Sequence, residues 1–469
     1  MSSLCSRTAA QLSADLALSR ITSRRLVEIA LEKIAEPTGE GSRAFMKVYR
    51  DAALTEADAS DRLRELGIVR SPIEGLPISV KDLFDVGGDV TLAGSKALEG
   101  SQPAKHDAVV VSRLRAAGAI IIGRTATVEF AFGGVGTNPH FGTPQNPFER
   151  SLNGGRVPGG SSSGAAVAVA DGMGIAGIGS DTRGSVRIPA ALCGLVGFKP
   201  TAERVPRNGV FPLSYSLDSV GPIGHSVGCA ALFDRIMSSP PGLTGTSTCV
   251  DSLHTELSSL PLSGLRLLVP QCSLFDDVEA PVTAAFEAAV TCLEAAGARV
   301  AHADAAVLTE TQGLFKDGGF AGPEAAYIHR DILRTRRHLY DPRVASRIAL
   351  GEGFSAADYV ALSFKRKEMI SRASELLAPY DAMLYPTTPC IAPLISQVEQ
   401  SDEEYVKWNL RLLRNPGLIN MLDGCALTLP CHAPGKAPVG FSIAGMGGTD
   451  QRVLAIGHAV EQALRNMHS

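Results

Sequence analysis

The chain has 469 residues, of which 45% are hydrophobic and 20% are charged, a composition typical of a globular protein with enough material for a large core. Lys and Arg total 44 against 48 Asp and Glu, a formal net charge of -4, so the charge indicates neither nucleic acid nor an anionic membrane as a partner. The nine cysteines are odd in number and include no C-x-x-C pair, which favours reduced thiols over a zinc site or a closed set of disulfides. The N-terminal stretch lacks the apolar region of a signal peptide and no apolar run is long enough to span a membrane, so we expect a cytoplasmic protein.

The N-terminal part is predicted to be mainly helical, followed by alternating strands and helices. Residues 1–70 are predicted to form a helical flank, because apolar residues recur at loosely helical spacing. The run LPISVKDLFDV is typical of a strand, and Lys81 stands where its apolar residues give way to acidic ones. A helix capped by Asp107 and closed by Gly118 is expected before a buried strand at 119–123. Helix followed by strand favours an α/β fold.

The C-terminal half continues the α/β pattern after a segment rich in Pro, Gly, Ser and Thr at 238–264. A strand, a helix and a strand are expected at 265–269, 281–296 and 299–301, and together they form a βαβ-like unit. Residues 327–372 are predicted to be helical and are unusually basic, for which a solvated helix face is the default explanation. The remaining predicted elements are strands at 382–385, 426–430 and 439–444 and a terminal helix at 450–464.

One stretch, residues 156–189, has almost no bulky side chains; its sequence is RVPGGSSSGAAVAVADGMGIAGIGSDTRGSVRIP. Glycine lets backbone N–H groups approach a ligand closely, and small hydroxyls between glycines can act as nucleophiles and proton carriers. We therefore interpret the stretch as the floor of a catalytic site. A flexible Gly/Ser linker is the plainer alternative, but it is disfavoured because residues 165–170 suit a buried helix.

Two short patterns in this stretch match known motifs without their context. Residues 172–177 fit the G-x-G-x-x-G of a dinucleotide site, but they follow a predicted helix and lack a ribose-binding acid. Residues 160–164 fit the nucleophile elbow of α/β-hydrolases on Ser162, with His432 or His458 to complete a triad, but a loop precedes them where a strand is needed. The elbow stays a minor alternative. The sequence has no H-E-x-x-H, P-loop or metal-ligand cluster, so we expect no metal and no organic cofactor.

Three segments carry the strongest functional signal: ISVKD at 78–82, GGSSSG at 159–164 and DTRGSVRIPAALCGLVGFKPT at 181–201. With them the chain resembles the amidase signature family, which has a lysine in a VKD context, a Gly-Gly-Ser-Ser-Gly-Gly-Ser stretch and Asp-Thr-Gly-Gly-Ser-Ile-Arg-x-Pro-Ala. Ser161 and Ser185 are 24 residues apart, the separation that this family shows between its catalytic serines. Other segments, such as HDAVVVSRLRAAGAIIIGRT and YPTTP, extend the likeness to nearly the whole chain.

The resemblance implies a catalytic set in which Ser185 is the nucleophile, Ser161 the bridging serine and Lys81 the base. A serine needs a base to take its proton, and a lysine can do so only when burial lowers its pKa from about 10.4. In relatives the peptide bond before the bridging serine is cis, which here is Gly160–Ser161. The oxyanion hole is expected from the backbone N–H groups of Thr182, Arg183, Gly184 and Ser185.

Arg183 departs from the family pattern, which mostly has glycine at this position. A guanidinium beside the nucleophile matches a substrate carboxylate in bidentate geometry, and a structural pairing with Asp181 or Glu203 is the alternative. The further substrate-binding residues that we expect are Phe132, Gly133, Tyr327 and His329. The last two lie in a segment that resembles the substrate-facing part of hydrolases of small carboxylated ureas, and helix packing is their alternative explanation.

These inferences converge on an amidohydrolase without a metal or organic cofactor. The resemblance implies a single domain over 1–469, with the helical flank 1–70, a signature core at 71–237 and a C-terminal half at 238–469. It implies an α/β fold in which helices cover both faces of a mixed, twisted β-sheet. The expected reaction is hydrolysis of the C–N bond of a small amide or urea-type substrate through an acyl-enzyme.

Two other functions stay open at this point. One is the A subunit of a glutamyl-tRNA amidotransferase, which would pass ammonia to a partner subunit. The other is a non-catalytic, amidase-like binding protein. Relatives are often dimers, so a homodimer is a further option for the assembly, and the only other partner that we expect is the small-molecule substrate.

Overall fold

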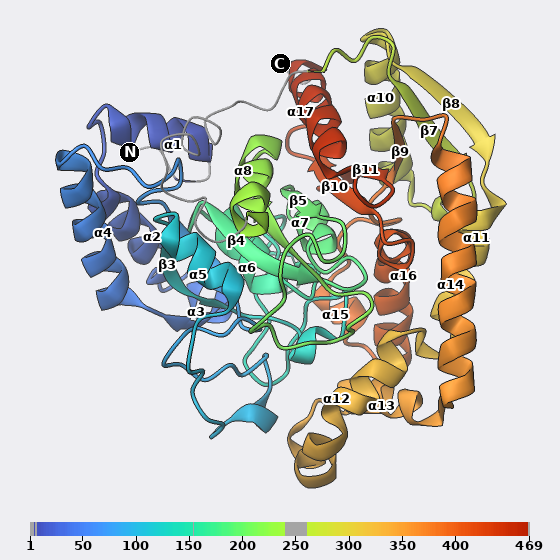
Figure 1. Cartoon of the computed structure of the whole chain (residues 1–469), viewed down its shortest axis with the longest axis horizontal. Coiled ribbons are helices and arrows are strands. Elements are labelled where there is room, and N and C mark those ends of the chain that lie inside the picture. Colours follow the sequence, from blue (N-terminus) through green and yellow to red (C-terminus); the bar gives the residue numbers. More distant parts are fainter. Residues whose placement is uncertain (1–3, 5–6, 153, 240–259, 468–469) are drawn as a thin grey trace.

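The computed structural model describes Leu4 and residues 7–152, 154–239 and 260–467 (Figure 1). Most of the Pro- and Gly-rich segment 238–264 therefore lies outside the described residues, as do Cys5 and Cys249. The other seven cysteines are free thiols. No helix among the described residues is both long enough and apolar enough to cross a membrane.

Within the described residues, the strands form one 11-stranded sheet in the order β1-β3-β2-β4-β6-β5-β10-β11-β9-β7-β8. The strands are β1 (Phe45–Val48), β2 (Pro77–Lys81), β3 (Ile120–Thr125), β4 (Ala176–Asp181), β5 (Val196–Lys199), β6 (Ser219–Gly224), β7 (Arg266–Gln271), β8 (Arg299–Asp304), β9 (Ala382–Pro386), β10 (Cys425–Pro430) and β11 (Gly440–Gly445). β2 is parallel to β3 and β4, and β7 is parallel to β8 and β9, whereas the other neighbours are antiparallel. The sheet is mixed, as the resemblance implies.

Helices cover this sheet along its whole length. The α-helices before β7 are α1 (Ala9–Ala17), α2 (Ser23–Ile34), α3 (Gly41–Ala44), α4 (Arg50–Glu65), α5 (Val109–Ala116), α6 (Ser163–Ala170), α7 (Arg187–Leu192) and α8 (Val227–Ser238). Those after it are α10 (Ala280–Ala295), α11 (Ala306–Gln312), α12 (Ala321–Arg336), α13 (Pro342–Ala349), α14 (Ala356–Leu377), α15 (Ile395–Val398), α16 (Asp402–Met421) and α17 (Asp450–Met467). Short 3₁₀ turns are η2 (Lys96–Leu98), η3 (Glu129–Ala131), η4 (Ser273–Phe275), η5 (Gly313–Gly318), η6 (Arg337–Leu339) and η7 (Leu350–Gly353).

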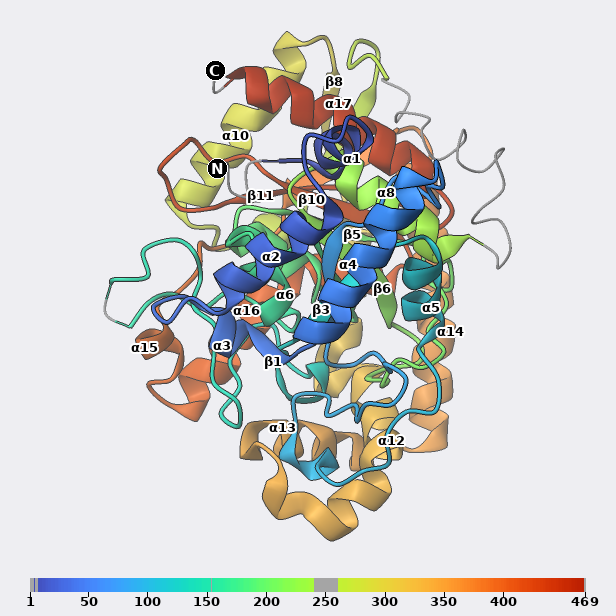
Figure 2. The same cartoon turned by 90° about the vertical axis from the view of Figure 1, so that its left-hand side faces the viewer.

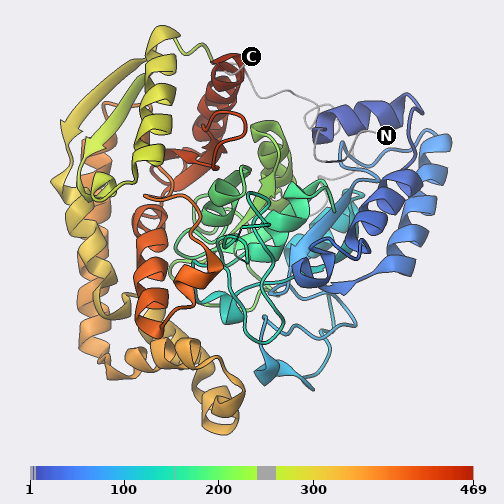
Figure 3. The same cartoon turned by 180° about the vertical axis from the view of Figure 1, so that it is seen from behind.

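The figures show how these helices are distributed. α2 and α4 lie side by side over the end of the sheet that holds β1, β3 and β2 (Figure 2). α10 and α17 pack together at one end of the molecule, while α12 and α13 lie at the opposite end in both the front and the back views (Figure 3).

The central strands of the C-terminal half are buried on both faces. Along β10, Leu427 belongs to an apolar cluster with α10 and α17, whereas its neighbour Ala426 belongs to a cluster with α14 and α16. On β9, Leu384 belongs to the cluster with α10 and α17, and Met383 belongs to the cluster with α14 and α16. Successive side chains of a strand point to opposite faces, so an uninterrupted apolar strand requires helices on both sides, and the structure supplies them.

Most of the predicted elements are confirmed, including the βαβ unit, in which β7 and β8 are parallel and α10 connects them. Two expectations were wrong. The flank 1–70 contains a strand, β1, which pairs with β3 at the edge of the sheet. Asp107 does not cap α5: the cap position is Ala108, and the Asp107 carboxylate accepts the N–H of Gly87 instead.

The basic segment 327–372 is helical, but it is divided among α12, α13 and α14 by two 3₁₀ turns. Arg330 and Arg334 are solvent-exposed, as expected for a solvated helix face. Arg347 differs, because its guanidinium donates to the backbone carbonyl of Phe132 and lies over that ring. Arg347 of the basic segment therefore helps to fix the position of the loop that follows η3.

Candidate active site

Lys81 lies at the carboxyl end of β2, and its parallel neighbour β4 ends at Asp181. Carboxyl ends of adjacent parallel strands meet at one edge of a sheet, where sites are commonly built. The Nζ of Lys81 donates to the Oγ of Ser161 at 2.6 Å and to the Oγ of Ser180 at 2.9 Å. The sheet thus brings the predicted base into hydrogen-bond contact with the predicted bridging serine.

The Lys81 side chain is fully buried. Burial lowers its pKa to about 7, although the carboxylates of Asp218 and Asp181 act in the opposite direction. An ammonium group loses its hydration when it is buried, so the neutral amine becomes the more stable form. Near neutral pH a large share of Lys81 is therefore able to accept a proton.

The serine cluster lies directly beside the turn that carries Ser185. The peptide bond between Gly160 and Ser161 is cis, as predicted. The backbone N–H of Ser162 donates to the carbonyl of Ser185 at 3.1 Å, and the Ser162 hydroxyl donates to the carbonyl of Ser180. No strand precedes Ser162 among residues 157–161, so the local geometry that a nucleophile elbow requires is missing.

α6 follows the serines and is apolar and buried from Ser163 to Val169. Its small residues are a packing requirement: a Cβ at Gly164 would lie 2.3 Å from the carbonyl oxygen of Ala44. The alanine and glycine content that marks this stretch in the sequence therefore reflects close approach of backbones around α6.

Asp181 organises the turn that leads to Ser185. Its carboxylate accepts the N–H groups of Gly184 at 2.7 Å, Val186 at 3.2 Å and Arg187 at 3.4 Å. The N–H of Gly184 is thus already engaged, which corrects the expectation that it is an oxyanion donor. The N–H groups of Thr182, Arg183 and Ser185 donate to no acceptor among the described residues, so they stay available.

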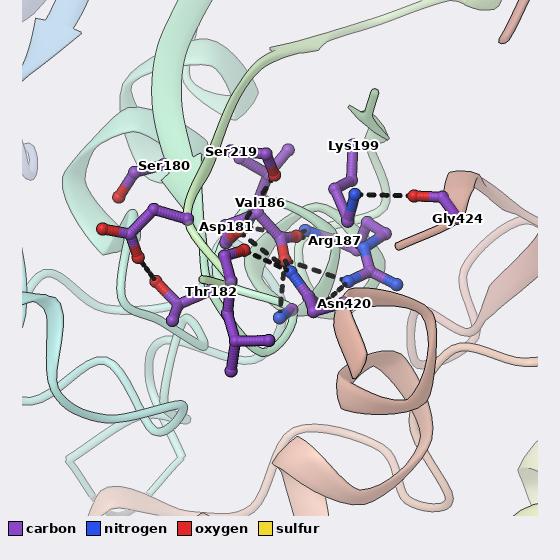
Figure 4. Close-up of polar contacts among 12 residues, drawn as sticks. Ser180, Asp181, Thr182, Val186, Arg187, Lys199, Ser219, Asn420 and Gly424 are labelled. Carbon is purple, nitrogen blue, oxygen red and sulfur yellow. Dashed lines mark hydrogen bonds and ion pairs between the residues drawn. The ribbon is translucent and has the colours of Figure 1, made fainter. Parts of the chain in front are cut away.

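Three side chains, those of Arg187, Asn420 and Ser219, hold Asp181 in turn, and the Ser219 hydroxyl donates to its backbone carbonyl at 2.9 Å (Figure 4). Arg187 contacts the carboxylate with Nε at 3.0 Å and Nη2 at 2.9 Å, and Nη2 also donates to the Oδ1 of Asn420 at 2.7 Å. The Nδ2 of Asn420 donates to the backbone carbonyl and to Oδ1 of Asp181, both at 3.0 Å. Burial alone would raise the pKa of Asp181, but the Arg187 guanidinium holds it well below its usual range.

Sequence reasoning did not find Asn420. It lies near the end of α16, 239 residues from Asp181, and neither spacing nor local pattern connects it to the serines. A second unpredicted group is Asp218, which accepts the hydroxyl of Thr182 at 2.6 Å and so supports the same turn from the side of β6.

Arg183 is half-buried and forms no hydrogen bond or ion pair with any described residue. Its guanidinium lies over the ring of Phe315, with Cζ 3.9 Å from the ring centroid. The structural pairings weighed from the sequence are not formed, because Asp181 pairs with Arg187 and Glu203 forms no ion pair with Arg183. Burial lowers the pKa of Arg183 to about 10, and no neighbouring carboxylate offsets that effect.

The remaining predicted substrate-binding residues are dispersed. Phe132 is half-buried and Gly133 is buried in the loop after η3. His329 is fully buried, with Nδ1 3.0 Å from the hydroxyl of Tyr340 and the rings of Phe130 and Phe211 around it, so it packs α12 against the core. Tyr327 on the same helix is 66% exposed.

Two neighbouring cavities open near this edge of the sheet. One of about 520 Å³ is lined by Ser180 and Asp218, and so reaches a direct hydrogen-bond partner of Lys81. The other, of about 700 Å³, contains Tyr327. Glu203, Arg207 and Tyr215 line both cavities. Among the described residues, no group of three His, Cys, Asp or Glu side chains is placed to hold a metal ion.

Comparison with known proteins finds relatives along nearly the whole chain. The sequence model of the family described as Amidase matches residues 25–454. The chain is 34% identical to 2-amino-5-chloromuconic acid deaminase of Comamonas testosteroni over 98% of each chain. It is 35% identical to the 1-carboxybiuret hydrolase subunit AtzE of Pseudomonas sp. (strain ADP) over 81% of each. A solved amidase crystal structure superposes with a TM-score of 0.84 and 31% identity over 97% of this chain and 99% of that one. The chain therefore belongs to the amidase family.

Proposed function

We propose that this protein hydrolyses the C–N bond of a small amide or urea-type substrate through an acyl-enzyme on Ser185. The observation that carries the proposal is the hydrogen bond from the buried Lys81 to Ser161, in a position where burial lowers the pKa of Lys81 to about 7. The name of one relative, a 1-carboxybiuret hydrolase subunit, supports the substrate class, because biuret contains urea-type C–N bonds. The name of another, 2-amino-5-chloromuconic acid deaminase, supports removal of nitrogen from a small acid.

In the first half of the reaction, Ser185 loses its proton to Ser161 as its Oγ attacks the substrate carbonyl carbon, and Ser161 passes its own proton to neutral Lys81. A hydroxyl can donate and accept at once, which suits Ser161 to this relay. The oxygen of the tetrahedral intermediate carries the negative charge, and the unengaged N–H groups of Thr182, Arg183 and Ser185 are the donors for it.

In the second half, the C–N bond breaks and the nitrogen leaves with the proton returned from Lys81 through Ser161. The product at this stage is an ester of Ser185 with the acyl part of the substrate. Water then attacks this ester with the same relay as base, which releases the acid and restores Ser185.

The proposal is tested by measuring ammonia release from a panel of small amides and ureas with the wild-type protein and with Ser185→Ala. We expect release from at least one compound class and none from the variant. Equal release from both proteins, or none from the wild type on any compound, would reject a Ser185 hydrolase; the second result is also what a non-catalytic binding protein would give.

An amidotransferase A subunit is the second candidate, because such subunits are also among the similar proteins. It predicts that the purified chain alone is inactive on small amides and that glutamine is the ammonia source only when a partner subunit is present. Hydrolysis of a non-glutamine amide by the chain alone distinguishes the two functions. The same preparation also shows, by light scattering, whether the expected homodimer forms.

A further inference from the structure

We infer that Arg183 is the recognition site for a carboxylate on the substrate, and that Phe315 is a positioning residue that holds this guanidinium ready. This inference rests on the proposed function, because it concerns the same site. It narrows the substrate from any small amide to one that carries a negative charge close to the bond that is cleaved.

The first argument is the cost of an unpaired cation. Arg183 has neither a carboxylate nor a carbonyl partner among the described residues, and its Nε is buried without an acceptor. Burial of a charge without a counterion is unfavourable, and the fully buried arginines Arg187 and Arg124 are paired with Asp181 and Asp82. Arg183 is only half-buried, so it bears part of this cost. An anionic ligand would give Arg183 the carboxylate partner that the protein itself supplies to Arg187 and Arg124.

The second argument is how Arg183 is held. One face of its guanidinium lies on the Phe315 ring at 3.9 Å, and its Nε lies 3.4 Å from the position that a Cβ on Gly417 of α16 would take. A cation on an aromatic face is attracted without being neutralised. Phe315 and the backbone at Gly417 therefore orient the guanidinium while its full charge is kept.

The third argument concerns which nitrogens of Arg183 can still bind a ligand. The Arg183 side chain is half-buried, and Nε is its one nitrogen that is both buried and without a partner among the described residues. Paired terminal N–H groups of arginine match the two oxygens of a carboxylate in bidentate geometry. Arg183 is two residues before Ser185 in the chain, so we expect a carboxylate bound there to belong to a small molecule that presents its carbonyl to Ser185.

A different role for the same charge is stabilisation of the oxyanion. That role would help every amide equally, because every amide passes through the same tetrahedral intermediate. Carboxylate recognition helps only substrates that carry the carboxylate. The two roles therefore separate in a comparison of matched charged and neutral substrates.

The experiment compares succinamate with succinamide, which differ only in a carboxylate against a carboxamide. Arg183→Gln is expected to lower kcat/KM for succinamate roughly 10- to 100-fold, the usual effect of removing a charged hydrogen-bond partner, and to lower kcat/KM for succinamide by a much smaller factor. Arg183→Lys keeps the charge without the planar fork and should lose less. Phe315→Leu should raise KM for succinamate with little change in kcat. Arg334→Gln, which removes an exposed guanidinium on α12, is the matched control and should change neither substrate.

Binding of succinate, measured by calorimetry, gives a readout that does not need catalysis. We expect succinate to bind the wild-type protein and Arg334→Gln, and to bind Arg183→Gln roughly 10- to 100-fold more weakly. An equal loss of kcat/KM on both amides, equal succinate affinity in Arg183→Gln, or no succinate binding to the wild type overturns the inference. If the wild type cleaves neither amide, the proposed function fails for these compounds, whereas the succinate measurement still decides the role of Arg183.

Discussion

The Nζ of Lys81 and the Oγ of Ser161 lie 2.6 Å apart although the two residues are separated by 80 positions in the chain. β2 ends at the lysine, and the serine lies two residues before the start of α6, which packs against β2 and β4. The contact joins a buried amine to a hydroxyl, and no acidic side chain in the described part of the chain is hydrogen-bonded to this amine. This combination is what we expect of a lysine that acts as a base instead of a structural cation.

The pH dependence of kcat/KM follows from the pKa of Lys81, which burial lowers to about 7. The base must be neutral to accept a proton, so kcat/KM should rise with pH through about 7 and level off above it. Lys81→Met, which keeps the side chain's length and apolar stem, should lower kcat/KM by about 10²- to 10⁴-fold. A flat pH profile across this range would contradict the assignment of Lys81 as the base.

The hydroxyl of Ser180 accepts a second hydrogen bond from Lys81. Removing it in Ser180→Ala takes an acceptor away from the ammonium form, so the pKa of Lys81 should fall further and the rising limb of the pH profile should move to lower pH. Ser79→Ala is the matched control, because Ser79 is also buried on β2 and its hydroxyl has no partner among the described residues. Identical profiles for the two variants would mean that Ser180 does not act on Lys81.

Asn420 should position the turn of Ser185 through Asp181. Asn420→Ala removes one of the two side-chain donors to the carbonyl of Asp181, the other being the Ser219 hydroxyl, and also removes a donor to the Asp181 carboxylate. This should reduce the unfolding free energy by about 1–3 kcal/mol and also lower kcat. Asn415→Ala on the same helix removes comparable hydrogen bonds to the carbonyls of Leu274 and Pro386. It should therefore reduce the unfolding free energy by a similar amount and leave kcat unchanged. Urea unfolding and kcat, measured on both variants, check this; equal kcat in the two would show that Asn420 is only structural.

Gly184 should not tolerate a side chain. Its φ is +111°, a conformation that residues with a Cβ rarely adopt, and a Cβ there would lie 2.5 Å from Cγ of Pro416. Gly184→Ala should therefore cost at least about 1–3 kcal/mol of unfolding free energy and displace Ser185. Gly353→Ala, where a Cβ would meet open space, is the control and should leave both stability and kcat near wild type.

His329 should make the protein less stable in acid. Burial lowers its pKa to about 4 from about 6.5, so the folded protein resists protonation that the unfolded chain accepts. The contribution of neutral His329 to the unfolding free energy is therefore fully present above about pH 6.5. It is lost as pH falls toward 4, by roughly 1.4 kcal/mol per pH unit inside that window.

His329→Gln removes this titration, so the unfolding free energy of the variant should change less between neutral and mildly acid pH than that of the wild type. His338→Gln changes an exposed histidine and should keep the wild-type dependence. Urea unfolding of all three proteins at two pH values gives the slopes; a wild-type slope in His329→Gln would assign the acid sensitivity to other groups.

The sequence predicts the elements whose signal is local. The βαβ unit β7-α10-β8 and the helix-strand pair α5-β3 follow from apolar periodicity and length. Lys81 and the serines could be proposed as catalytic residues because each lies in a short contiguous segment and the segments resemble those of a family. β1 was missed because four residues within a helical flank are too few to show an alternation.

The groups that tie distant segments together could not be predicted in the same way. Asn420 acquires its role only when α16 packs beside the turn after β4, and no single-sequence pattern reports that contact. The engagement of the Gly184 N–H by Asp181 depends on the path of a short turn. The sequence around His329 does not show whether this side chain faces a substrate or the ring of Phe130. The packing of α12 determines which of the two it contacts.

The most direct test of the central claim is to treat the protein with a fluorophosphonate and to locate the adduct by mass spectrometry of its peptides. The account predicts one adduct on Ser185, which is absent in Ser185→Ala and forms much more slowly in Lys81→Met. An adduct on Ser162, or labelling of Ser185 that proceeds at the same rate without Lys81, would contradict it.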